Sequence, residues 1–146
     1  MAPIAQDVPV PVPVRGAEMG TDATQDRRAL AVIRITIGAM FVWVFFENYN
    51  KGAYTPAGYR GVIDYYLKNG HAPAAWKSVM AFVADHASVA GPLQAITELG
   101  FGLALVTGAA SRLVAAAAAG FLFTLWLSEF GAAWIWELLV PTLVAA

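Results

Sequence analysis

The sequence contains no cysteine and only two histidines, His71 and His86. The absence of cysteine excludes disulfides, thiolate chemistry, zinc held by cysteine and iron–sulfur clusters within this chain. Both histidines lie between the apolar segments, which excludes a haem held by two histidines inside a bilayer. Since neither histidine has an aspartate or glutamate at a metal-ligand spacing, we expect no metal site. Any redox chemistry would therefore need an organic cofactor, a quinone or a partner subunit.

Charged residues are also scarce. They make up 13% of the 146 residues, whereas hydrophobic residues make up 59%. Soluble domains have about 25% charged residues. The net charge of −1 lacks the basic excess that is typical of nucleic-acid-binding proteins. The composition therefore indicates a membrane protein, and the length indicates one domain.

The first 26 residues lack an apolar helical pattern. Valine and proline alternate over residues 8–14, which favours an extended polyproline conformation and excludes helix there. We expect residues 1–26 to form a disordered N-terminal tail, followed by a membrane domain at 27–146. A docking arm for a partner is the alternative interpretation of this tail.

Four apolar segments follow, at about 28–46, 87–107, 113–128 and 134–146. A helix needs about 20 apolar residues to cross a bilayer, so the last segment is short and we expect it to be truncated or completed elsewhere. The first segment is not a cleavable signal, because the chain before it is too long. The pattern predicts an all-α fold, an integral membrane, antiparallel four-helix bundle.

Two short amphipathic helices are predicted between the first two spans. Thr55 followed by Pro56 is typical of a helix start, and Gly70 of a helix end, which predicts a helix over 56–69. A second helix is expected from Pro73 to His86. Their tyrosine and tryptophan residues favour a position at the membrane surface.

Two charges fall inside the apolar segments. Glu98 lies half-way along the second span, where a charge costs on the order of 3 kcal/mol and usually faces the bundle interior. Arg34 lies about 6 Å and Glu98 about 13 Å inside the same membrane face, at 1.5 Å per residue. We therefore predict a buried Arg34–Glu98 ion pair. It would form either a polar, proton-handling pocket or a salt bridge that fixes helix register. Arg34 alone could also extend its side chain to the membrane surface.

A second polar group is expected at the opposite membrane face. Carboxylates there lie near amphipathic aromatic residues, a combination that suits a quinone headgroup site with proton donors. An ordinary aromatic belt with charges at the span ends is the alternative. The candidate residues are Glu47, Tyr49, Lys51, Tyr54, Glu129, Trp134 and Glu137.

The chain resembles the DoxX/DoxD family of small four-helix bacterial membrane proteins. The matching stretches are RITIG at 34–38, ENYNKGAYTPAGY at 47–59, and ELGFGLAL at 98–105 with Gly108 and Arg112 after it. The resemblance covers residues 28–146, and the segment at 51–59 is more similar to the DoxD branch. That family includes the small DoxD-type subunit of thiosulfate:quinone oxidoreductase. The resemblance implies an antiparallel four-helix membrane bundle, but it assigns no catalytic residues.

Three functional interpretations stay open. The first is a quinone-linked subunit of a respiratory or redox membrane complex, in the bacterial inner membrane with a lipid bilayer and other protein subunits as partners. The second is a non-catalytic accessory or scaffold subunit, and the third is a small carrier or proton pathway. The arginine pair before the first span and the carboxylates at the opposite face favour cytoplasmic termini.

Overall fold

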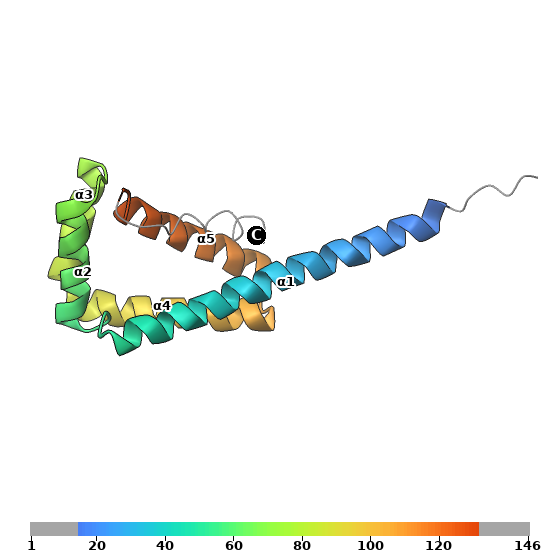
Figure 1. The fold of residues 1–146 in the computed structure, drawn as a ribbon, viewed down its shortest axis with the longest axis horizontal. Coiled ribbons are helices and arrows are strands. Elements are labelled where there is room, and N and C mark those ends of the chain that lie inside the picture. The colour runs from blue at the N-terminus through green and yellow to red at the C-terminus, as the bar shows by residue number, and fades with distance from the viewer. Residues whose placement is uncertain (1–14, 132–146) are drawn as a thin grey trace, which may run out of the picture.

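The computed structural model describes residues 15–131, and the regular secondary structure in that range is entirely helical (Figure 1). The all-α prediction is confirmed for this part of the chain. The helices are α1 (Arg15–Asn50), α2 (Pro56–Asn69), α3 (Ala74–Asp85), α4 (Ala87–Thr107) and α5 (Ser111–Ser128). Residues 1–14 and the fourth predicted span at 134–146 lie outside the described residues.

The two short helices lie across one end of the three longer ones (Figure 1). Both occur where the sequence predicted them. The Thr55 hydroxyl accepts a hydrogen bond from the Gly58 N–H at 3.1 Å, and Pro56 occupies the first turn of α2. At the other end of α2, the N–H of Gly70 donates to the Tyr66 carbonyl at 2.8 Å. Local capping therefore fixes the bounds of α2.

Helix α1 begins earlier than expected. Residues 15–26 are helical, whereas the sequence analysis assigned them to a disordered tail. The prolines of the tail end at Pro13, and the residues after it are free of proline and include several good helix formers. The resulting helix is 36 residues long, and its N-terminal part extends beyond the other helices (Figure 1).

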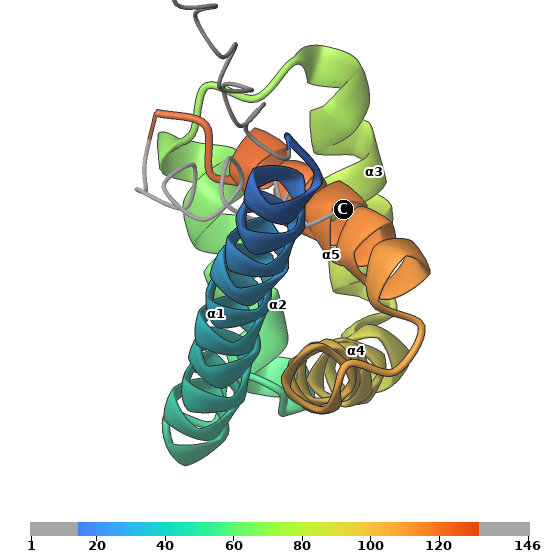
Figure 2. The same ribbon diagram turned by 90° about the vertical axis from the view of Figure 1, so that its right-hand side faces the viewer.

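The most extensive helix contact joins α1 to α4, and two glycines make it close. A Cβ added to Gly38 would lie 2.8 Å from the Gly102 carbonyl oxygen. A Cβ added to Gly102 would lie 2.7 Å from a methyl group of Val42. Helix α5 completes a three-helix core, and Figure 2 shows it beside α1 with α4 viewed along its axis. The buried core residues are Ile37, Phe41, Leu105, Ala115, Ala118 and Leu122.

Within residues 15–131, two helical segments are long and apolar enough to cross a membrane. They are Gln25–Asn50 and Ala87–Thr107, and the apolar segment Arg112–Ser128 is shorter. Large apolar side chains on these helices face outward, with Trp43 72% exposed and Ile96 70% exposed. A continuous apolar exterior of this kind is unusual for a protein surrounded by water.

The glycine contact between α1 and α4 gives a first prediction. Gly102→Ala should destabilise the protein by about 1–3 kcal/mol, because the added methyl group overpacks the contact with α1. Thermal unfolding in detergent, followed by circular dichroism, measures the change. Gly100→Ala is the matched control, since a Cβ there meets nothing within 4 Å. Equal effects of the two substitutions would contradict the proposed close contact.

Candidate functional site

The candidate site is centred on Glu98, whose side chain is only 2% exposed. Three neutral side chains donate hydrogen bonds to its carboxylate. Gln94 Nε2 donates to Oε1 at 2.8 Å, and Asn48 Nδ2 approaches Oε2 at 3.5 Å. The Tyr54 hydroxyl donates a short hydrogen bond to Oε2. Around Glu98, therefore, the hydrogen bonds come from α1, from the loop after it and from α4 itself.

The loop at 51–55 carries Tyr54 back toward α4. Gly91 permits this approach, because a Cβ at that position would lie 2.5 Å from the Tyr54 carbonyl oxygen. The Tyr54 ring then stacks on Phe45, with ring centroids 5.7 Å apart. Burial raises the pKa of the Tyr54 hydroxyl, and the hydrogen bond to Glu98 and the charge of Glu98 raise it further. Tyr54 is therefore a stable hydrogen-bond donor to Glu98.

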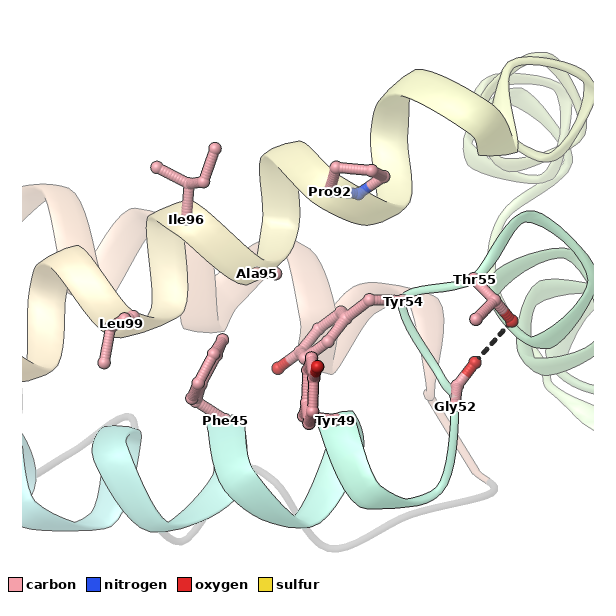
Figure 3. A pocket seen from close by; sticks show the side chains of 9 residues that line it. All are labelled: Phe45, Tyr49, Gly52, Tyr54, Thr55, Pro92, Ala95, Ile96 and Leu99. Atoms are coloured by element: carbon pink, nitrogen blue, oxygen red, sulfur yellow. Dashed lines mark hydrogen bonds between the residues drawn. The ribbon is translucent and has the colours of Figure 1, made fainter.

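A cleft of about 630 Å³ opens between α1 and α4 beside this cluster (Figure 3). The rings of Phe45, Tyr49 and Tyr54 line it, and Phe45 also stacks on Tyr49 at a centroid distance of 6.1 Å. The remaining lining residues are Gly52, Thr55, Pro92, Ala95, Ile96 and Leu99. The cleft is thus apolar and aromatic, and Tyr54 connects it to Glu98. An arrangement of this size and chemistry suits a flat, apolar molecule.

A second carboxylate, that of Glu129, is half-buried. Glu129 follows α5 and is hydrogen-bonded by Tyr66 of α2. Burial raises the pKa of the Glu129 carboxyl; the Tyr66 hydrogen bond acts in the opposite direction, and the charge of Glu98 raises it further. Burial also raises the pKa of Tyr59, as does the charge of Glu98. Tyr59 donates to Gln94 Oε1 at 2.8 Å and so extends the polar cluster to α2.

The predicted Arg34–Glu98 ion pair is wrong. The guanidinium of Arg34 lies against Gly108, where a Cβ would be 2.6 Å from Nη1. Gly108 is ten residues beyond Glu98 along α4, which corresponds to about 15 Å. The contact of Gly38 with Gly102 sets this register and directs Arg34 toward the C-terminal end of α4. A cation at that helix end is electrostatically favourable.

The structure does not bring the residues of the predicted quinone headgroup site together. Tyr49 and Tyr54 line the cleft together, and Glu129 is not among the residues that line it. Glu47 and Lys51 form an exposed ion pair at 2.5 Å, one helical turn apart. Trp134 and Glu137 lie outside the described residues.

Four members of the cluster were not among the sequence-predicted candidates. They are Asn48, Gln94, Tyr59 and Tyr66. The spacing of Gln94 and Glu98, four residues apart on a helix, was a usable signal because such side chains are neighbours. Asn48 depends on the register of α1 against α4, and Tyr59 and Tyr66 depend on where α2 packs. Among residues 15–131, no group of three or more histidine, cysteine, aspartate or glutamate residues could hold a metal ion.

Comparisons of the chain with protein-family profiles, with curated protein sequences and with solved structures found no match.

The Tyr54–Glu98 hydrogen bond gives a second prediction. Tyr54→Phe should destabilise the protein by about 1–3 kcal/mol, because a buried carboxylate loses one of its donors. Tyr49→Phe is the control, because Tyr49 lines the same cleft but is 66% exposed. Chemical unfolding in detergent tests both variants. A Tyr54→Phe protein as stable as Tyr49→Phe would show that the hydroxyl is not needed by Glu98.

The environment of Glu129 gives a third prediction, on pH dependence. Its folded-state pKa is raised, so the folded protein binds a proton more tightly than the unfolded chain. The stability should therefore fall as the pH rises from about 4 through the folded-state pKa. Glu129→Gln should reduce this fall, whereas the exposed Glu47→Gln should not. Unfolding midpoints measured across pH test this, and an unchanged pH profile of Glu129→Gln would contradict it.

Proposed function

We propose that this chain is a small integral membrane subunit of a quinone-linked redox complex, as its resemblance to the DoxX/DoxD family implies. The outward-facing surface supports membrane integration. Only 17% of the apolar stretch in Gln25–Asn50 and 22% of that in Ala87–Thr107 is buried within the protein. The core helix of a water-soluble protein would be mostly buried. Lipid is the environment that makes such exposed apolar surface favourable.

The single observation that carries the quinone proposal is the aromatic cleft in front of a buried carboxylate. A quinone has a planar ring with two carbonyl oxygens and an apolar tail. The stacked rings of Phe45, Tyr49 and Tyr54 offer flat surfaces for the ring, and Ile96 and Leu99 offer apolar surface for the tail (Figure 3). Quinone supplies two-electron, two-proton redox chemistry when bound. In this chain, Tyr54 holds a proton beside the cleft and donates it in a hydrogen bond to the Glu98 carboxylate.

In the proposed complex the electrons come from another subunit, because this chain has no cysteine to hold an iron–sulfur centre. The extension of α1 favours a subunit role, because that part of the helix projects past the other described helices (Figure 1). An accessory subunit without its own chemistry would share this extension, but it would not need the aromatic cleft. The carrier interpretation based on an Arg34–Glu98 pair loses its basis, because the two side chains are far apart.

The localisation follows from the same proposal. The chain would lie in a bacterial inner membrane, with α1, α4, α5 and the segment at 134–146 forming an antiparallel four-helix bundle. Helices α2 and α3 would then lie at one membrane surface, and the termini would be cytoplasmic.

Quinone binding in the cleft is the fourth prediction. Ala95→Trp fills the cleft and should weaken the binding of a short-chain ubiquinone by about tenfold or more, or about 1.4 kcal/mol. Isothermal titration in detergent measures the affinity. Leu103→Trp is the control, because Leu103 is exposed on the same helix but does not line the cleft. Binding that is absent in the unmodified protein, or unchanged by Ala95→Trp, would refute the proposed site.

A further inference from the structure

The hydrogen bonds around Glu98 all run in one direction. The Tyr59 hydroxyl donates to Gln94 Oε1 at 2.8 Å, and Gln94 Nε2 donates to Glu98 Oε1 at 2.8 Å. The Tyr54 hydroxyl and the Asn48 amide donate to Glu98 Oε2. Because a carboxylate only accepts and a hydroxyl has a single hydrogen, each of these bonds directs its hydrogen toward Glu98. The hydroxyl hydrogen of Tyr54 is therefore used inside the protein.

This direction determines what the Tyr54 hydroxyl presents to the cleft. Tyr54 lines the cleft, and Figure 3 shows its side chain reaching between α1 and α4 with the hydroxyl oxygen at its tip. A hydroxyl oxygen whose hydrogen is donated elsewhere keeps lone pairs that accept hydrogen bonds. Burial and the neighbouring Glu98 both raise the pKa of Tyr54, so the hydroxyl stays protonated. Toward the cleft, Tyr54 is thus an acceptor.

Other polar groups of the cleft wall also have their hydrogens engaged. The Thr55 hydroxyl donates to the Gly52 carbonyl at 2.6 Å, the bond drawn as a dashed line in Figure 3. The backbone N–H of Gly52 donates to the Tyr49 carbonyl at 3.0 Å, and that of Thr55 donates to the Gly52 carbonyl at 3.1 Å. Pro92, which also lines the cleft, has no N–H. The exposed Tyr49 hydroxyl suits a donor and an acceptor equally, so it adds no preference.

We propose that the cleft binds a quinol, the reduced form of its ligand, in preference to the oxidised quinone. This preference rests on the proposed quinone function, since both concern the same cleft. A quinol carries two hydroxyl groups, one of which can donate to the Tyr54 oxygen. A quinone carries carbonyl oxygens that only accept, so its carbonyl would face the Tyr54 lone pairs with no hydrogen between them. A site that hydrogen-bonds a ligand hydroxyl discriminates against the analogue that lacks it.

The binding of a short-chain ubiquinone and of its hydroquinone to the full chain tests this preference. Isothermal titration in detergent, under nitrogen to keep the hydroquinone reduced, gives both dissociation constants. The hydroquinone should bind about tenfold more tightly, a difference of about 1.4 kcal/mol. The dimethyl ether of the same hydroquinone keeps the ring and the tail but has no hydroxyl, so it should bind as weakly as the quinone. Ala95→Trp fills the cleft and should weaken the binding of both redox forms.

Substitutions on the two sides of the Tyr54–Glu98 hydrogen bond should change the two affinities differently. Tyr54→Phe removes the acceptor, so hydroquinone binding should fall about tenfold while quinone binding stays the same. Glu98 is a positioning residue, because it holds the Tyr54 hydrogen away from the cleft. Glu98→Leu frees that hydrogen, so quinone binding should strengthen and the ratio of the affinities should fall. Tyr49→Phe is the matched control and should retain the tenfold ratio, because the exposed Tyr49 hydroxyl suits both forms.

The outcomes separate this preference from the proposed function. Equal affinities of quinone and hydroquinone in the unmodified protein overturn the preference and leave the quinone site standing. Equal affinities of the hydroquinone and its dimethyl ether also overturn it, and that comparison needs no variant to fold. An unchanged ratio in Tyr54→Phe overturns it as well. If neither redox form binds the unmodified protein, the proposed function fails together with the preference.

Discussion

The arrangement of this protein depends on keeping Glu98 satisfied inside an apolar helix contact. A carboxyl buried to this extent needs donors within hydrogen-bond distance. Gln94 is the donor on its own helix, while Asn48 and Tyr54 come from the end of α1 and the loop after it. These bonds require the chain to turn back over α4 directly after Asn50. The position of α2, which starts at Pro56, follows from that turn.

Close helix packing and the polar cluster determine each other. The Gly38–Gly102 contact brings α1 against α4, and it sets the register that places Asn48 beside Glu98. Closer to the loop, Gly91 lets the Tyr54 backbone reach α4. Beyond this tight contact the aromatic cleft opens between the two helices, and the rings of Phe45, Tyr49 and Tyr54 line it. The cleft therefore results from the same register that buries the carboxylate.

Local sequence signals predicted the short helices, because Thr55, Pro56 and Gly70 act within one or two turns of their own position. The burial of Glu98 could also be predicted, since a charge within an apolar span has few alternatives. The hydrogen-bond partners of Glu98 outside its own helix could not be predicted from the sequence. Counting residues from the span ends placed Arg34 near Glu98, but the register depends on a close backbone approach between Gly38 and Gly102 that no local pattern reveals. The early start of α1 was missed because residues 15–26 have no apolar periodicity, the pattern from which the longer helices were predicted.

The identity of those partners has a chemical consequence. An Arg34–Glu98 pair would have stabilised the ionised carboxylate and fixed its charge. Tyrosine, asparagine and glutamine instead hydrogen-bond to Glu98 without a compensating charge. Neutral donors stabilise the carboxylate through hydrogen bonds alone, so the contacts that position the loop over α4 also determine the chemical surroundings of Glu98 behind the cleft.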